Sequence, residues 1–95
     1  MIVAAPPPSF TPIIAAVKTV YPRSPIHITR ICVVEPRTLV RLRVKGRDSY
    51  VALERRDRKW KAVWVDGSIL RSVLPARRAT VATEVRSLRT RCLAP

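Results

Sequence analysis

The middle of the chain alternates apolar and polar residues with a period of two. The segments LVRLRVK (39–45), YVALER (50–55) and WKAVWV (60–65) show this alternation, and GRDS and RDRK separate them. Such alternation is typical of β-strands that bury one face. The stretch Leu39–Gly67 therefore predicts three antiparallel strands joined by two hairpins.

The hairpin loops predict which residues face each other. With Gly46–Ser49 as the first loop, Leu42 faces Leu53, and with Arg56–Lys59 as the second, Leu53 faces Ala62. We then expect one apolar face and one basic face. The apolar face holds Val40, Leu42, Val44, Val51, Leu53, Ala62 and Trp64. The other face holds Arg41, Arg43, Lys45, Tyr50, Ala52, Glu54, Lys61, Val63 and Val65, with Glu54 between Arg41 and Lys61.

A further strand precedes this meander. The segment Ile26–Val34 is rich in β-branched residues, which favour strands. With Glu35–Thr38 as its loop, Val34 faces Leu39. This register predicts Ile31 and Val33 in the core, with Arg30 and Cys32 outside. It also sets Arg30 against Arg43, a like-charge pair, so a bulge here, or a shift of one residue that buries Cys32, is the alternative.

Helices are predicted at both ends. Thr11 and Pro12 suit a helix start, and Pro22 ends that helix by Tyr21. A last helix runs from Pro75 to about Arg91. Its apolar stripe is Val81, Val85, Leu88 and Cys92, extended by Leu74, and the first helix has a stripe of Ile13, Ile14, Val17 and Val20.

These elements define a two-layer α+β domain over residues 10–95. Its order is an N-terminal helix, a four-stranded antiparallel meander and a C-terminal helix, and we expect both helices on the face with Leu42, Leu53 and Trp64. Residues 1–9 are expected to form an extended, proline-rich arm.

The net charge of the chain indicates what kind of partner the domain binds. The chain of 95 residues carries 19 Lys and Arg against 6 Asp and Glu, a net charge of +13, while 47% of its residues are hydrophobic. A folding chain with this excess suits a polyanion, either a nucleic acid or an acidic protein surface. The alternative is that the charged face is only solvated. The candidate polyanion-binding residues are Arg30, Arg41, Arg43, Lys45, Tyr50 and Lys61 on the sheet, Arg56, Arg58 and Lys59 at the second hairpin, and Arg77 and Arg78 at the last helix.

Catalysis is not expected, and neither is a cofactor or metal. The chain has two glycines and no glycine-rich phosphate loop. With one histidine and two cysteines, a zinc site lacks ligands. We favour two buried thiols over a Cys32–Cys92 bridge, and with them a cytoplasmic location over export. No apolar run is long enough for a membrane span.

Two segments resemble known families. The segment Tyr50–Ile69 resembles the closing hairpin of cystatin-like and NTF2-like small domains, and together with Ile31–Val44 it is similar to small uncharacterised exported bacterial domains. This resemblance implies a fold and an extracytoplasmic location. The segment PARRAT, Pro75–Thr80, resembles the basic start of the last helix of the double-stranded-RNA-binding domain, although that family's lysine-rich signature is absent.

The sequence thus predicts a noncatalytic binding or assembly module that contacts a polyanion, with nucleic acid as the first candidate. Two alternatives stay open. One is an exported or envelope accessory domain with incidental charge and a Cys32–Cys92 bridge. The other is a structural subunit of a larger particle, or a homo-oligomer, in which the proline arm orders against a neighbour.

Overall fold

The chain folds as a helix, an antiparallel meander and a second helix. A computed structural model describes residues 10–93, so the predicted arm of residues 1–9 lies outside the described residues. The α+β class and the element order are confirmed, and a short fifth strand adds to the four predicted ones. The elements are α1 (Thr11–Val20), β1 (Ile26–Val34), β2 (Arg37–Val44), β3 (Arg47–Arg56), β4 (Lys59–Val65), β5 (Ser68–Ile69), a 3₁₀ turn η1 (Pro75–Arg77) and α2 (Arg78–Leu93), with the strands in the order β1-β2-β3-β4-β5.

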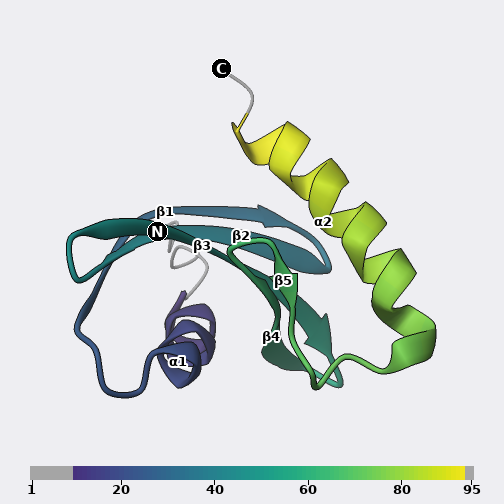
Figure 1. Ribbon diagram of the computed structural model, residues 1–95, viewed down its shortest axis with the longest axis horizontal. Coiled ribbons are helices and arrows are strands. Elements are labelled where there is room, and N and C mark those ends of the chain that lie inside the picture. The colour runs from purple at the N-terminus through teal and green to yellow at the C-terminus, as the bar shows by residue number, and fades with distance from the viewer. Residues whose placement is uncertain (1–9, 94–95) are drawn as a thin grey trace, which may run out of the picture.

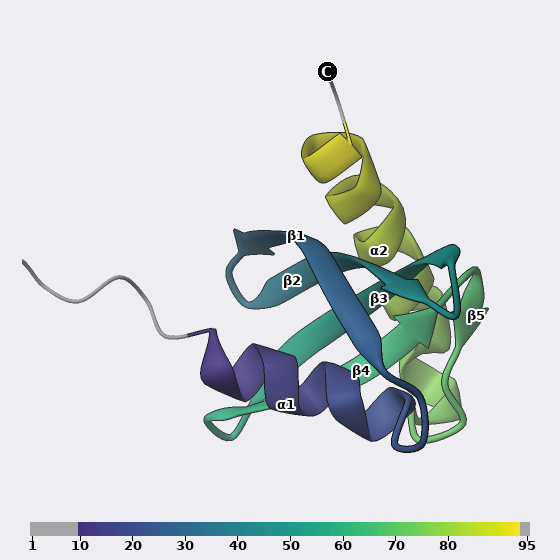
Figure 2. The same ribbon diagram turned by 90° about the vertical axis from the view of Figure 1, so that its left-hand side faces the viewer.

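The two helices cover opposite faces of the sheet (Figure 1, Figure 2). The prediction of two layers with both helices on one face is therefore wrong, because the central strands bury residues on both faces. Neighbours such as Leu39 and Val40 on β2 belong to different clusters. The α1 cluster consists of Ile13, Ala16, Val17, Val40, Leu42, Val51 and Leu53. The α2 cluster consists of Leu39, Ala52, Val63, Trp64, Val73, Val81, Val85, Leu88 and Cys92.

The β2–β3 hairpin is tighter than predicted. Its loop is Lys45–Gly46, with φ of 52° and 76°, and such left-handed pairs match the twist of the flanking strands. Leu42 consequently faces Ser49 instead of Leu53, a displacement of four positions. Because four is an even number, every side chain keeps its predicted face.

The β3–β4 hairpin follows the prediction only near its tip. Arg55 faces Trp60 and Leu53 faces Ala62, as expected, but the register shifts between Leu53 and Ala52. This bulge places Trp64 opposite Ala52 and in the α2 cluster, whereas Val65 packs against the α1 cluster. Both were predicted on the reverse faces, because one extra residue inverts the alternation beyond it.

The β1–β2 hairpin also turns earlier than predicted. Val34 faces Arg37 and Arg30 faces Arg41 instead of Arg43, with an irregularity between Ile28 and Arg30. Ile31 packs against the α1 cluster as predicted, whereas Val33 is 41% exposed. Its side chain is thus not in the core.

A disulfide joins Cys32 on β1 to Cys92 on α2, with 5.9 Å between the two Cα atoms. The preference for two free thiols is therefore wrong. The register of β1 explains the bond, since Cys32 faces Leu39 on the side of the sheet that α2 covers.

The first helix ends where the sequence predicts, whereas the last helix begins later than predicted, because Pro75–Arg77 form the 3₁₀ turn η1 and α2 runs from Arg78 to Leu93. Helix α1 ends at Val20 and has a proline in its first turn. The predicted stripe of α2 is buried: Val81, Val85, Leu88 and Cys92. Leu74 is 62% exposed, however, and Val73 at 4% takes its place in the core.

Candidate polyanion-binding site

One end of the sheet face that carries α2 is free of the helix and strongly basic. Six residues from β1, β2 and β3 surround a hollow of about 420 Å³ there, which we call the basic hollow. Its residues are His27, Thr29, Arg30, Arg41, Arg43 and Asp48. The only acid among them is Asp48.

The strand registers explain how these side chains meet. Across β1 and β2, Arg30 faces Arg41 and His27 faces Arg43. His27 and Arg30 are three residues apart, so in a regular strand their side chains would point to opposite faces. The bulge at Thr29 adds one residue and places both side chains on the same face. The Thr29 hydroxyl donates to the Arg41 carbonyl oxygen at 3.1 Å. The bulge therefore gathers a histidine and three arginines on one surface.

Asp48 holds two of the arginines from the neighbouring strand. Its Oδ2 accepts from Arg41 Nη2 at 3.2 Å and its Oδ1 from Arg43 Nε at 3.4 Å. The hydrogen bond from Arg41 holds the pKa of Asp48 below its usual range, against a smaller opposing effect of desolvation, and the same bond raises the pKa of Arg41. Asp48 thus stays negative at neutral pH and pairs with Arg41 and Arg43, whereas Arg30 has no ion-pair partner among the described residues.

We expect Asp48→Asn to strengthen polyanion binding, because it removes the negative charge of the basic hollow and keeps the side chain's shape. For a unit charge about 6 Å away in a water-like dielectric, the gain is about threefold in affinity for duplex DNA at low salt. Fluorescence anisotropy measures it. The matched control is Asp57→Asn, which makes the same charge change at the β3–β4 turn. Weaker binding of Asp48→Asn would instead mean that the carboxylate is needed to position Arg41 and Arg43.

Tyr50 lies beside the hollow, but its ring is not a free stacking platform. The Arg41 guanidinium lies over the ring, 6.0 Å from its centroid, and the ring also packs against the α2 cluster. The Tyr50 N–H donates to Asp66 Oδ1 at 2.8 Å. Tyr50 therefore serves to hold Arg41 in place.

The structure separates the predicted residues into groups. Lys45 lies at the β2–β3 loop, near the basic hollow, and Arg47 beside it was missed. Lys61 shares the sheet face, but the α2 cluster residues Leu39, Ala52 and Trp64 lie between it and Arg41. The predicted site is thus not one continuous surface.

The remaining basic residues have other surroundings. Arg77 Nη2 is 2.5 Å from Glu54 Oε1, and Glu54 is 6% exposed, so this pair belongs to the fold. Glu54 faces Arg37 and Lys61 instead of the predicted Arg41 and Lys61. Arg78 begins α2. The residues Arg56, Arg58 and Lys59 lie at the β3–β4 hairpin, at the opposite end of the strands.

His27 was also missed by sequence reasoning. The sequence nevertheless contains a signal for its position. The predicted register sets Arg30 against Arg43, and this like-charge pair suggests a bulge in the first strand. With the bulge placed at Thr29, His27 moves to the basic face.

No family model matches the sequence, and no curated protein and no solved structure is significantly similar to it. The resemblance to cystatin-like and NTF2-like domains therefore stays a prediction. Within residues 10–93, no group of three or more His, Cys, Asp or Glu residues is arranged to hold a metal ion. None of the helices in that range is long and apolar enough to span a membrane.

Proposed function

We propose that the protein is a noncatalytic polyanion-binding module that holds phosphate groups in the basic hollow, with nucleic acid as the first polymer to test. The observation that carries this proposal is the pairing of Arg30 with Arg41 across β1 and β2. Like charges directly opposite each other destabilise a sheet, and no acid pairs with Arg30 among the described residues. A bound phosphate would relieve that repulsion.

The side chains suit phosphate chemistry. Arginine presents a planar fork of N–H donors that matches two phosphate oxygens. Arg43 is 61% exposed along its side chain and Arg41 45%, so both are open to a ligand while Asp48 orients them. Lys45 and Arg47 at the adjacent loop extend the positive surface. Contacts of this kind bind a backbone without reading its sequence.

We expect Arg30→Ala/Arg43→Ala to weaken binding to duplex DNA and to RNA. If both side chains neutralise phosphates, the slope of log K against log salt falls by about 2, close to one per contact. Anisotropy titrations at several salt concentrations measure this slope. The loss should be similar for different nucleic-acid sequences.

The control Arg86→Ala/Arg91→Ala removes the same charge from exposed positions of α2. We expect its salt slope to stay near that of the unchanged protein. Equal losses for the two double variants would assign binding to net charge alone. No binding of unchanged protein at low salt would contradict the proposal.

A second candidate is an accessory domain of an oxidising compartment, where the charge is incidental. The Cys32–Cys92 disulfide favours it, because such bonds persist mainly in secreted and envelope proteins. Titration of native, unreduced protein with a thiol reagent is expected to find no reactive thiol. Two reactive thiols would argue for a reducing compartment.

A further inference from the structure

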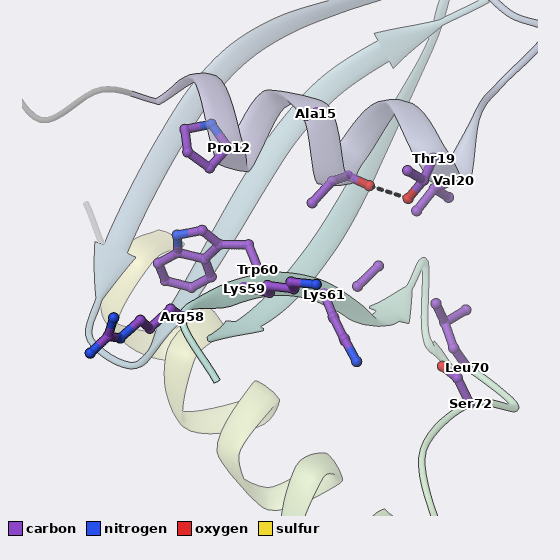
Figure 3. A pocket seen from close by; sticks show the side chains of 12 residues that line it. Pro12, Ala15, Thr19, Val20, Arg58, Lys59, Trp60, Lys61, Leu70 and Ser72 are labelled. Atoms are coloured by element: carbon purple, nitrogen blue, oxygen red, sulfur yellow. Dashed lines mark hydrogen bonds between the residues drawn. The ribbon is translucent and has the colours of Figure 1, made fainter. Parts of the chain in front are cut away.

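A groove with a basic rim lies on the far side of the molecule from the basic hollow. It has a volume of about 730 Å³ and runs between α1, the outer edge of β4 and the loop after β5. Figure 3 shows the Trp60 ring below Pro12 at one end and Leu70 with Ser72 at the other. Ala15 and Ala62 add small apolar side chains, so the groove is wide between its two ends.

The edge of β4 is unpaired along this groove. Strand β5 pairs with β4 only at Trp64 and Val65, and the Leu70 N–H donates to the Val63 carbonyl oxygen at 2.9 Å. Beyond that bond, no described strand pairs with Lys59–Ala62 on the side of β4 that faces away from β3.

The hairpin geometry shows which backbone groups point outward. The β3–β4 loop is Asp57–Arg58, both with positive φ, so Arg56 and Lys59 form the hydrogen-bonded pair that closes it. Pairs alternate along an antiparallel ladder, which makes Arg55–Trp60 and Leu53–Ala62 the non-bonded pairs. The N–H and C=O groups of Trp60 and Ala62 therefore face away from β3 and toward an incoming strand.

We propose that this edge binds an extended acidic segment of another protein, which adds to the sheet as a strand beside β4. The backbone groups of Trp60 and Ala62 would supply the ladder bonds. The side chains of a partner residue and its opposite neighbour share one face of a sheet. Partner residues opposite Trp60 and Ala62 would then lie on the α1 side, in the groove, and should be apolar.

The charge of β4 indicates which partner residues alternate with the apolar ones. Lys59 and Lys61 alternate with Trp60 along β4 and are exposed, and neither is ion-paired within residues 10–93. Partner residues opposite them should be acidic. The same lysines argue against a second copy of this chain, because antiparallel pairing of two β4 edges would bring lysines together. The expected ligand therefore alternates apolar and acidic residues.

The test uses synthetic peptides and the full chain. The probe is an acetylated, amidated (Glu-Val)₄ peptide with a fluorescent label, titrated by anisotropy. We expect binding that weakens about tenfold or more when alternate peptide nitrogens are methylated, since main-chain bonds supply the affinity. We also expect no binding of (Lys-Val)₄. Saturating duplex DNA in the basic hollow should leave peptide binding unchanged, which separates this proposal from the proposed function.

Protein variants locate the site. Lys59→Glu/Lys61→Glu should weaken binding about tenfold or more, whereas Arg86→Glu/Arg91→Glu makes the same charge change on α2 and should weaken it much less. Ala62→Pro removes an N–H that no strand uses, and proline is tolerated at such edge positions, so loss of binding with an unchanged circular dichroism spectrum is expected.

Several results would overturn the proposal: no binding of (Glu-Val)₄ at low salt, equal binding of the methylated peptide, equal losses in the two charge-reversed variants, or displacement by DNA. Light scattering completes the test. A dimer that Ala62→Pro disperses would assign this edge to a second copy instead.

Discussion

Leu53→Ala is expected to lower the free energy of unfolding by about 2 to 5 kcal/mol, the usual range for truncating a buried leucine. The Leu53 side chain is 0% exposed and packs in the α1 cluster, between Thr38 on β2 and Ala62 on β4. The two neighbouring strands and α1 surround the Leu53 side chain. We therefore expect them to move little into the cavity that the substitution leaves. Urea denaturation followed by circular dichroism measures the change.

Arg43→Ala is the matched control for this truncation. Arg43 lies on the other face of the same sheet and its side chain is 61% exposed, so we expect a change within about 0.5 kcal/mol. Similar losses at both positions would contradict the assignment of the two faces.

Removal of the disulfide is expected to lower the free energy of unfolding about as much as Leu53→Ala does. The bond closes a loop with a sequence separation of 60, for which chain-entropy arguments give about 4 kcal/mol. Cys32→Ala/Cys92→Ala should therefore lower the free energy of unfolding by about that amount. Alanine is chosen because Cys92 is 1% exposed, and a serine hydroxyl would be buried there. Denaturant titrations with and without reductant measure the effect.

Reductant provides the control. It should destabilise the unchanged protein by a similar amount and leave Cys32→Ala/Cys92→Ala unaffected. If reductant has no effect on the unchanged protein, the bond does not form in solution. The loss in the double variant would then reflect only the packing of Cys92 in the α2 cluster.

The candidate site was only partly predictable from the sequence. Alternation placed Arg41 and Arg43 on one face, and a four-residue displacement of the register did not alter this. His27 and Arg30 join them only through the bulge at Thr29, and the sequence does not fix where a bulge occurs. The predicted loop Gly46–Ser49 includes Asp48, but Asp48 lies within β3, because the actual loop contains only Lys45 and Gly46.

The sequence by itself determined the class of the fold. Period-two alternation identified β2, β3 and β4, the β-branched run identified β1, and prolines together with apolar stripes located both helices. These features follow from local sterics and from the amphipathic pattern of each segment. They need no knowledge of what the segment packs against.

The tertiary structure alone decided how these elements combine. The apolar residues Leu39, Ala52 and Val63 lie on the face predicted to be basic, and only packing against α2 shows that this face is half core. The bulge in β4 carries Trp64 to that face, and the disulfide anchors the end of α2 to β1. Helix α2 packs on the apolar half of this face and leaves the basic hollow open. The physical reason is that the apolar half forms only when residues from different strands come together, so no single segment of the sequence reveals it.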